Sequence, residues 1–143
     1  MIIAQNNYKT SVPQTELANR CFVVGPNGSG KTTILESIYW TIKGELPDDK
    51  KPIAKMQLAA NGLGVESSLS LPGMNIRREI SPGKSASKLF VDDSERKINE
   101  GNKLIGDYVG VCYVDSSASV SDKALLDDIY SLIVKCEKFP LKE

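Results

Sequence analysis

Hydrophobic positions along this chain follow a helical period in some segments and a strand period in others. The helical spacing is clearest between Lys31 and Lys43, where Ile34, Ile38 and Ile42 share one face. Gly44 follows directly and is the residue type that commonly ends a helix. Further helices are predicted at residues 52–60, at residues 99–108 and, after a cap at Ser121, along an apolar stripe at residues 125–136.

Strand-like alternation dominates the middle of the chain. Residues 65–71, 74–80 and 88–91 are short alternating segments, separated by Pro-Gly pairs at 72–73 and 82–83. This pattern is typical of antiparallel strands joined by tight turns. Short apolar runs at residues 21–24 and 109–114 predict further strands, the second of them buried because it lacks alternation. Residues 2–4 predict a short strand, followed by a polar stretch that Pro13 punctuates.

A glycine-rich motif lies between the run at 21–24 and the first helix. Residues 25–32 read GPNGSGKT, a complete G-x-x-x-x-G-K-[ST] phosphate-binding loop, and strand, loop and helix follow in the order that such a loop requires. The residues predicted to hold a nucleotide are Gly25, Pro26, Asn27, Gly28, Ser29, Gly30, Lys31, Thr32 and Thr33. The alternative is a glycine-rich turn that binds no nucleotide, and the flanking strand and helix argue against it.

Each residue type in the motif has a physical role in binding a di- or triphosphate. The three glycines reach backbone dihedrals that turn the loop amides inward around an anion at low cost. The N-terminus of the following helix adds unpaired N–H donors and partial positive charge. Lys31 is expected to contact the β- and γ-phosphates and the Thr32 hydroxyl to bind Mg²⁺, so the expected cofactors are ATP and Mg²⁺.

Composition narrows the class of protein without adding a site. A length of 143 residues suits one domain, and 18 Lys and Arg against 18 Asp and Glu give no charge excess that would point to nucleic acid or membrane. The three cysteines lie far apart in apolar surroundings, which favours reduced thiols and a cytoplasmic location. Histidine is absent, which excludes a histidine base, and we expect neither a signal peptide nor a membrane span.

The order of these parts resembles the head domains of RecF, RecN and SMC-type proteins, which are ABC-class ATPases of DNA repair and chromosome maintenance. The run FVVGPNGSGKTTILESIYW at residues 22–40 is similar to the family's phosphate loop and first helix, and NIRREISPGKSASKLFVDD at residues 75–93 to its strand, turn and strand. Residues 97–114 look like its connecting helix and next core strand, and Asn-Tyr at 7–8 makes RecF the nearest likeness. The resemblance implies an α/β P-loop NTPase fold: an ABC-type N-terminal lobe with an antiparallel β subdomain beside the Walker A strand, loop and helix.

The same resemblance implies that ATP is sandwiched between two heads, so that nucleotide binding acts as a dimerisation switch on DNA. Members of the family complete the site with a second lobe that carries an LSGGQ-like signature and an apolar run ending in Asp-Glu, and neither is complete here. Asp115 ends such a run, but Ser116 stands where the catalytic glutamate would follow, and Asn6 stands where the family usually carries an arginine. Hydrolysis is therefore expected to need the missing lobe or a partner chain, and no residue is predicted to be catalytic.

Basic residues in the strand region suggest a nucleic-acid surface. Arg77 and Arg78 are adjacent in a predicted strand and point to opposite faces, so only one of them can face a given ligand. With Lys84 and Lys88 they are the candidates for contacts with double-stranded or gapped DNA. The alternative is a solvated sheet edge whose charges prevent aggregation.

Residues 1–143 are accordingly expected to form one ATP-binding lobe, with a Walker A core at about residues 1–62 and 109–143 and a hairpin region at about 64–98. Two other functions stay open. One is a small P-loop kinase with Arg77, Arg78 and Lys84 as lid residues, although a kinase would normally continue to alternate helices and parallel strands beyond Val65. The other is a non-catalytic interaction domain whose loop binds no nucleotide.

Overall fold

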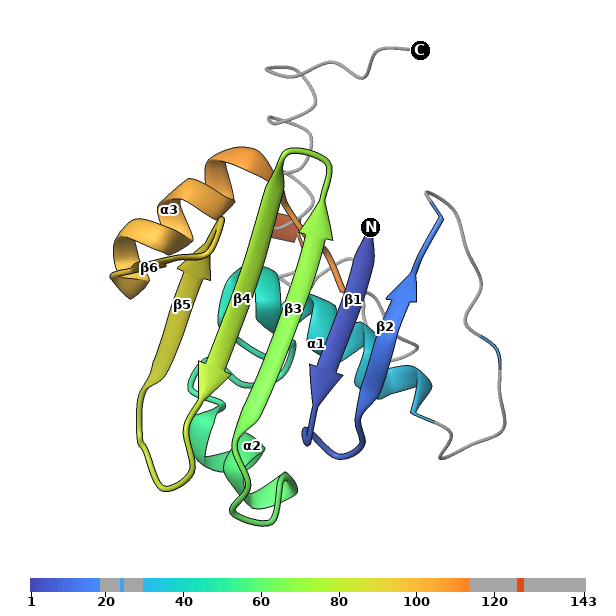
Figure 1. Cartoon of the computed structure of the whole chain (residues 1–143), viewed down its shortest axis with the longest axis vertical. Helices are drawn as coiled ribbons and strands as arrows, with labels where there is room; N and C mark the ends of the chain where they lie inside the picture. Colours follow the sequence, from blue (N-terminus) through green and yellow to red (C-terminus); the bar gives the residue numbers. More distant parts are fainter. Residues whose placement is uncertain (19–23, 25–29, 114–125, 128–143) are drawn as a thin grey trace.

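The computed structural model describes residues 1–18, 24, 30–113 and 126–127, and within them an antiparallel sheet is covered on one face by helices (Figure 1). The strands are β1 (Ile2–Asn6), β2 (Val12–Glu16), β3 (Val65–Leu71), β4 (Met74–Ile80), β5 (Ser87–Val91) and β6 (Ser94–Arg96). The helices are α1 (Lys31–Lys43), α2 (Ile53–Ala59) and α3 (Ile98–Tyr108). The strand order is β2-β1-β3-β4-β5-β6, so β1 pairs with β3, which is its neighbour in space but not in sequence.

Alternation along the central strands gives the sheet two unlike faces. In β3, Val65 and Leu69 are buried against the helices, whereas Glu66 and Ser70 are exposed on the other side. The face opposite the helices, here called the outer face, is turned toward the viewer in Figure 1, and no described helix covers it. Because a one-residue slip would move every buried side chain to the outer face, this pattern fixes the register of the strands.

The turns between strands have the chemistry that the hairpin pattern predicts. Gly73 and Gly83 have φ values of 86° and 73°, a left-handed conformation that glycine adopts without steric cost. The turn between β5 and β6 uses Asp92 and Asp93, both with positive φ, and aspartate tolerates this region better than most residues. The Asp92 carboxylate also accepts a hydrogen bond of 2.9 Å from the Asn75 N–H, which holds this turn against β4.

The expected elements agree with the structure where their local signals are strong. The bounds of α1, β3 and β4 are those that the pattern predicts, and α2 and α3 differ from their predictions only at the ends. The pattern does not predict β2 or β6. β2 contains Pro13, which is tolerated there because β2 is an edge strand, and all three residues of β6 are exposed.

The strand predicted at residues 109–114 is wrong for the part that is described. Residues 109–113 belong to no strand and are half-buried rather than buried. An apolar run becomes a strand only beside a neighbour that pairs with its backbone, and no described strand pairs with this one. The run predicted at 21–24, except Val24, and the Ser121 cap lie outside the described residues; of the last helix only Leu126 and Asp127 are described, and both are helical.

The helices pack on the sheet through two hydrophobic clusters, and α1 contributes to both. One cluster contains Ile3, Ile42, Leu69, Ile76, Leu89, Val91 and Ile105. The other contains Tyr8, Trp40, Leu46, Met56, Ala60, Val65 and Ile80. The C-terminal half of α1 is therefore fixed to the sheet through Trp40 and Ile42. Within the described part of the chain, no helix is long and apolar enough to cross a membrane.

β1 and β2 belong to the same sheet as the later hairpins, although the expected division groups residues 1–62 with the Walker A core. Strand pairing thus connects the two predicted parts directly. The division itself stays a prediction, because most of residues 109–143 lie outside the described residues.

Gly101 lies where α3 packs closely on Leu89 of β5, and this close packing gives a prediction of stability. An ideal Cβ there would overlap Leu89 Cδ2 and lie 3.1 Å from Leu89 Cγ, whereas a Cβ at Gly106 would meet nothing within 4 Å. Gly101→Ala is expected to lower the free energy of unfolding by about 1 to 3 kcal/mol through overpacking. Gly106→Ala, the control in the same helix, is expected to raise it by about 0.5 to 1 kcal/mol through helix propensity. Urea denaturation measures both, and stabilisation by both variants would contradict the close packing of α3 on β5.

Candidate nucleotide-binding site

The N-terminus of α1 is the part of the predicted phosphate loop that the structure describes. Gly30 precedes the helix with a φ of 95°, and its carbonyl accepts a hydrogen bond of 3.1 Å from the Ile34 N–H. The helix begins at Lys31, where the motif places it. Residues with a side chain adopt the conformation of Gly30 only at a cost, which explains the glycine at this position. Gly25, Pro26, Asn27, Gly28 and Ser29 lie outside the described residues.

This helix end fits an anion. No side chain caps it, and its first turn contains no acidic residue. The first N–H groups of a helix have no acceptor within the helix, and the peptide dipoles place positive charge there. Thr32 is exposed and Thr33 is buried, so the Thr32 hydroxyl is the one on the solvent side. The end suits the phosphates of ATP, with Lys31 as a charged ligand and Thr32 as a ligand for Mg²⁺.

The turn between β1 and β2 lies beside this helix end. A Cβ placed on Gly30 would come within 3.3 Å of Thr10 Cγ2. Asn7 and Lys9 in the same turn have positive φ values of 73° and 60°, which is uncommon outside glycine and indicates a backbone held by its surroundings. The turn therefore forms a wall next to the predicted nucleotide site, outside the sequence motif.

Gln5 of β1 holds this turn from inside the protein. Its buried Nε2 contacts three acceptors: the carbonyl oxygens of Tyr8 at 3.1 Å and Thr10 at 2.9 Å, and Ser37 Oγ at 3.2 Å. Its Oε1 accepts a hydrogen bond of 2.8 Å from the Tyr8 N–H. One side chain thus connects β1, the turn and α1, and these bonds compensate the cost of burying its polar amide.

A second link between the turn and α1 involves Glu36. The Tyr8 hydroxyl donates a hydrogen bond to the Glu36 carboxylate, and the Lys9 ammonium lies 3.4 Å from the same group. Burial, with the hydrogen bond to Glu36 as the next cause, raises the pKa of Tyr8. The phenol therefore stays protonated at neutral pH and remains a donor to Glu36.

Sequence reasoning misses both of these links. Gln5 lies two residues after Ile3 and so shares its buried face, and a polar residue on a buried face is the available signal that its side chain is hydrogen-bonded. For Glu36 the sequence carries no comparable signal, because its partners come from a distant turn.

The C-terminal end of α1 is closed by Gly44. This residue has a φ of 73°, and its N–H donates a hydrogen bond of 2.7 Å to the Trp40 carbonyl. A Cβ at Gly44 would lie 3.0 Å from Nη1 of Arg78. Glycine is therefore required here both by the backbone conformation and by the close guanidinium.

Arg78 of β4 binds the last carbonyls of α1. Its Nε donates to Thr41 O at 2.9 Å, and its Nη2 donates to Ile42 O at 3.3 Å and to Asn102 Oδ1 of α3 at 2.6 Å. A cation is favourable at this position because the helix dipole places negative charge at the C-terminus. Burial lowers the pKa of Arg78 to about 10, which leaves the group charged at neutral pH.

The prediction of Arg78 as a DNA contact is therefore wrong. Only 1% of its surface is exposed, because alternation places it on the inner face between Ile76 and Ile80. Arg77 faces outward, but its Nε lies 3.2 Å from Glu79 Oε1 and its guanidinium lies 4.2 Å from the centre of the Phe90 ring.

The remaining basic candidates are exposed. Lys84 lies in the turn between β4 and β5, and Lys88 lies on β5. Any nucleic-acid role of Arg77, Lys84 and Lys88 stays a prediction, and the inward position of Arg78 removes one of the four cations from the predicted patch.

The described residues contain no cluster of three or more Asp, Glu or Cys side chains that could hold a metal ion. Asp115 and Ser116 lie outside them. In the described part of the site, Mg²⁺ ligation would rest on Thr32 and on the oxygens of the nucleotide itself.

Similarity to known proteins is found at the level of a family model. No curated protein is significantly similar to the chain. A family model described as an AAA domain matches residues 21–136, a range that contains the phosphate-loop motif, all three described helices and β3 to β6. The match spans well over half of the chain, and the chain therefore belongs to the AAA domain family of P-loop ATPases.

Proposed function

We propose that this chain is the ATP-binding lobe of a RecF-like ATPase of DNA repair and recombination, in which Mg-ATP binding is a switch for pairing with a second lobe or head. The observation that carries the nucleotide-binding part is the start of α1. The helix begins at Lys31, directly after Gly30 of a complete GPNGSGKT motif, with no side-chain cap and no acid in its first turn. A phosphate is the ligand that completes such a helix end.

The antiparallel strands after α1 support an ABC-type lobe over a small kinase. β3, β4 and β5 pair antiparallel through hairpins, whereas a kinase would continue with helices and parallel strands. The resemblance of residues 22–40 and 75–93 to RecF, RecN and SMC-type heads supports the role in DNA repair.

The proposed switch rests on the resemblance to heads that hold ATP between two copies. The sequence contains no complete LSGGQ-like signature and no Asp-Glu pair after an apolar run. A nucleotide held at the start of α1 would then present its γ-phosphate to donors of another lobe, and ATP would stabilise the paired state more than ADP does. We expect slow hydrolysis, or none, by this chain alone.

Lys31→Ala is expected to weaken the binding of a fluorescent ATP analogue in Mg²⁺ by roughly 10- to 150-fold. The reason is the loss of a charge-assisted hydrogen bond to phosphate, which contributes about 1.5 to 3 kcal/mol. A fluorescence titration measures the dissociation constant. Lys55→Ala, which removes an exposed lysine of α2, is the matched control and should leave that constant unchanged.

Three outcomes would contradict this proposal at different levels. If the wild type and Lys31→Ala bind the ATP analogue with equal affinity, the motif is not a nucleotide site, and a non-catalytic interaction domain is favoured. If the chain transfers the γ-phosphate of ATP to nucleosides or sugars, it is a kinase and not an ATP-dependent switch. Sedimentation of the chain mixed with a candidate second lobe tests the pairing. If the chain binds nucleotide but the sedimenting species has the same mass with ATP as with ADP, ATP does not promote pairing.

A further inference from the structure

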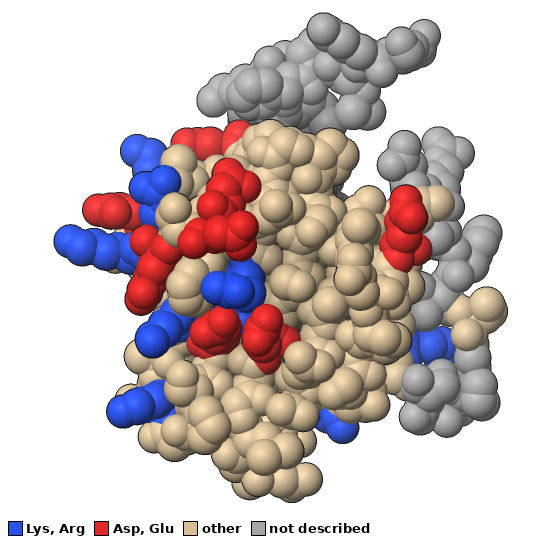
Figure 2. All heavy atoms as spheres, in the orientation of Figure 1, with Lys and Arg blue, Asp and Glu red and all other residues tan. Residues whose placement is uncertain are grey.

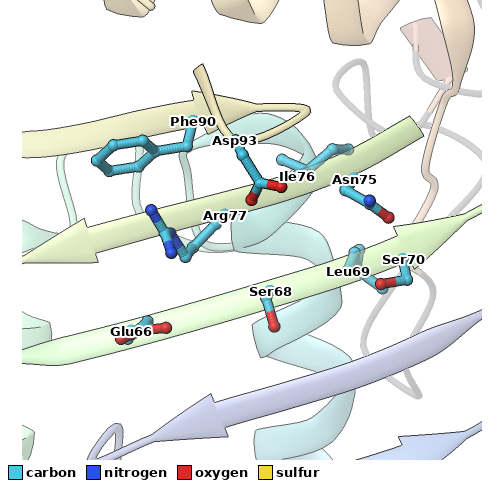
Figure 3. Close-up of a pocket in the computed structure, with 9 residues that line it drawn as sticks. All are labelled: Glu66, Ser68, Leu69, Ser70, Asn75, Ile76, Arg77, Phe90 and Asp93. Atoms are coloured by element: carbon cyan, nitrogen blue, oxygen red, sulfur yellow. The ribbon is translucent and has the colours of Figure 1, made fainter. Parts of the chain in front are cut away.

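The outer face of the sheet carries charges of both signs. A hollow of about 260 Å³ lies on it, and both Arg77 and Glu66 line this hollow (Figure 3). Lys88 is the register partner of Glu79 on the same face, and Figure 2 shows acidic and basic side chains interspersed over β4 to β6. These charges offset one another and select no ligand. The contacts between α1 and the turn that joins β1 to β2 are more specific.

Two adjacent residues of α1 hold the β1–β2 turn, which comprises residues 7–11. The Glu36 carboxylate accepts a hydrogen bond from the Tyr8 hydroxyl, and Ser37 Oγ lies 3.2 Å from the Gln5 amide nitrogen. Both residues lie about one and a half helical turns from the start of α1, the end that suits a phosphate. The turn and the proposed nucleotide site are therefore fixed to the same short stretch of helix.

The Ser37 contact does not fix the turn by itself. The Gln5 amide nitrogen carries two hydrogens but faces three acceptors, the carbonyl oxygens of Tyr8 and Thr10 and the Ser37 hydroxyl. The Ser37 hydroxyl donates its own hydrogen to the Thr33 carbonyl at 2.6 Å, so towards Gln5 it acts only as an acceptor. Its distance of 3.2 Å is the longest of the three. The position of the turn against α1 therefore depends mainly on the contact one residue earlier in the helix.

Glu36 meets Tyr8 at a place shielded from water. Tyr8 is fully buried and only 15% of the Glu36 side chain is exposed, so water competes poorly for the hydrogen bond. The Lys9 ammonium lies 5.3 Å from the centre of the Tyr8 ring and 3.4 Å from the same carboxylate. Positive φ at Asn7 and Lys9, on both sides of Tyr8, is a strained conformation that persists only where contacts hold it. Glu36 supplies such contacts to both Tyr8 and Lys9.

We propose that Glu36 is a positioning residue of the nucleotide site. It holds Tyr8, whose carbonyl accepts a hydrogen bond of 2.6 Å from the Thr10 N–H. Thr10 in turn stands beside Gly30, where a Cβ would lie 3.3 Å from Thr10 Cγ2. Glu36 acts through the turn and does not itself contact the nucleotide. A wall that is held in place before the ligand arrives avoids the cost of ordering it on binding, so the affinity for nucleotide depends on this hydrogen bond. The role rests on the proposed binding of nucleotide at the start of α1.

The test compares Glu36→Gln with Glu36→Leu in titrations of the full chain with the fluorescent ATP analogue in Mg²⁺. Both variants remove one negative charge and the ion pair with Lys9, but only glutamine keeps a side-chain oxygen that accepts from the Tyr8 hydroxyl. Loss of the charge should affect both alike. Glu36→Leu is therefore expected to bind the analogue roughly two- to tenfold more weakly than Glu36→Gln. Tyr8→Phe should cause a similar weakening in the Glu36→Gln background and none in the Glu36→Leu background.

Glu95→Gln and Glu95→Leu are the matched control pair, because Glu95 is exposed on β6, at the opposite edge of the sheet from β2. These two variants should bind the analogue equally. All titrations are made at a temperature at which thermal unfolding shows each variant to be folded, which separates affinity from stability. A ¹⁵N spectrum without nucleotide gives a second readout: Glu36→Leu should shift the Thr10 and Gly30 amides more than Glu36→Gln does.

Equal affinity of Glu36→Leu and Glu36→Gln would overturn the positioning role, as would a Tyr8→Phe effect of the same size in both backgrounds. Failure of the wild type to bind the analogue would instead remove the proposed nucleotide function and this role together. The two failures are distinguishable, because only the second abolishes binding by the wild type.

Discussion

Replacing Arg78 by alanine is expected to lower the free energy of unfolding by about 3 to 5 kcal/mol. The substitution empties a buried volume, and truncation of a large core side chain to alanine costs about 2 to 5 kcal/mol. It also takes the donor away from the carbonyls of Thr41 and Ile42, and buried acceptors without a partner add to the loss. Removing the desolvated charge offsets part of this cost, so the terms do not simply add.

The neighbouring arginine is the matched control for this experiment. Arg77→Ala loses a partly exposed ion pair with Glu79 and a contact with Phe90, which together contribute less than about 2 kcal/mol. Urea denaturation followed by circular dichroism gives both free energies. A loss for Arg78→Ala no greater than that for Arg77→Ala would contradict the structural role of the buried guanidinium.

Gln5→Leu is expected to destabilise the fold by about 2 to 4 kcal/mol and to weaken nucleotide binding as well. Leucine conserves the volume, so the cost comes from hydrogen bonding: the N–H and C=O of Tyr8 lose their buried partner, and each unpaired group costs about 1 to 3 kcal/mol. The turn that carries Thr10 is then no longer held beside Gly30. The affinity for the ATP analogue should fall along with the stability.

Gln14→Leu makes the same change at an exposed position of β2 and should alter stability by less than about 0.5 kcal/mol. Thermal unfolding gives the first effect, and fluorescence titration at a temperature where all variants are folded gives the second. If Gln5→Leu lowers stability but binds the analogue with unchanged affinity, the turn is not a wall of the nucleotide site.

The sequence allows elements to be placed accurately where their ends carry local signals. α1 starts after a phosphate-loop glycine and stops at Gly44, and the Pro-Gly pairs delimit β3 and β4. β2 and β6 have no such signals. They are the two edges of the sheet, and their conformation follows from pairing with β1 and β5 rather than from their own pattern.

The sequence predicts only those parts of the candidate site whose residues are contiguous in the chain. The motif indicates the loop residues directly, whereas the contact between Gln5 and Ser37 depends on the tertiary fold. Arg78 lies between these cases. Alternation alone leaves open which of the two arginines is inside, but Ile76 and Ile80 flank Arg78 at two-residue spacing and mark its face as the buried one.

The pairing of β1 with β3 has a consequence for how the chain folds as it is synthesised. The phosphate-loop motif, α1 and α2 all lie between these two strands in the sequence. The β1–β2 hairpin leaves the ribosome before β3, and one edge of β1 stays without a partner until residues 65–71 emerge. A nascent chain that stalls before β3 therefore carries an open strand edge, the kind of surface on which aggregation begins.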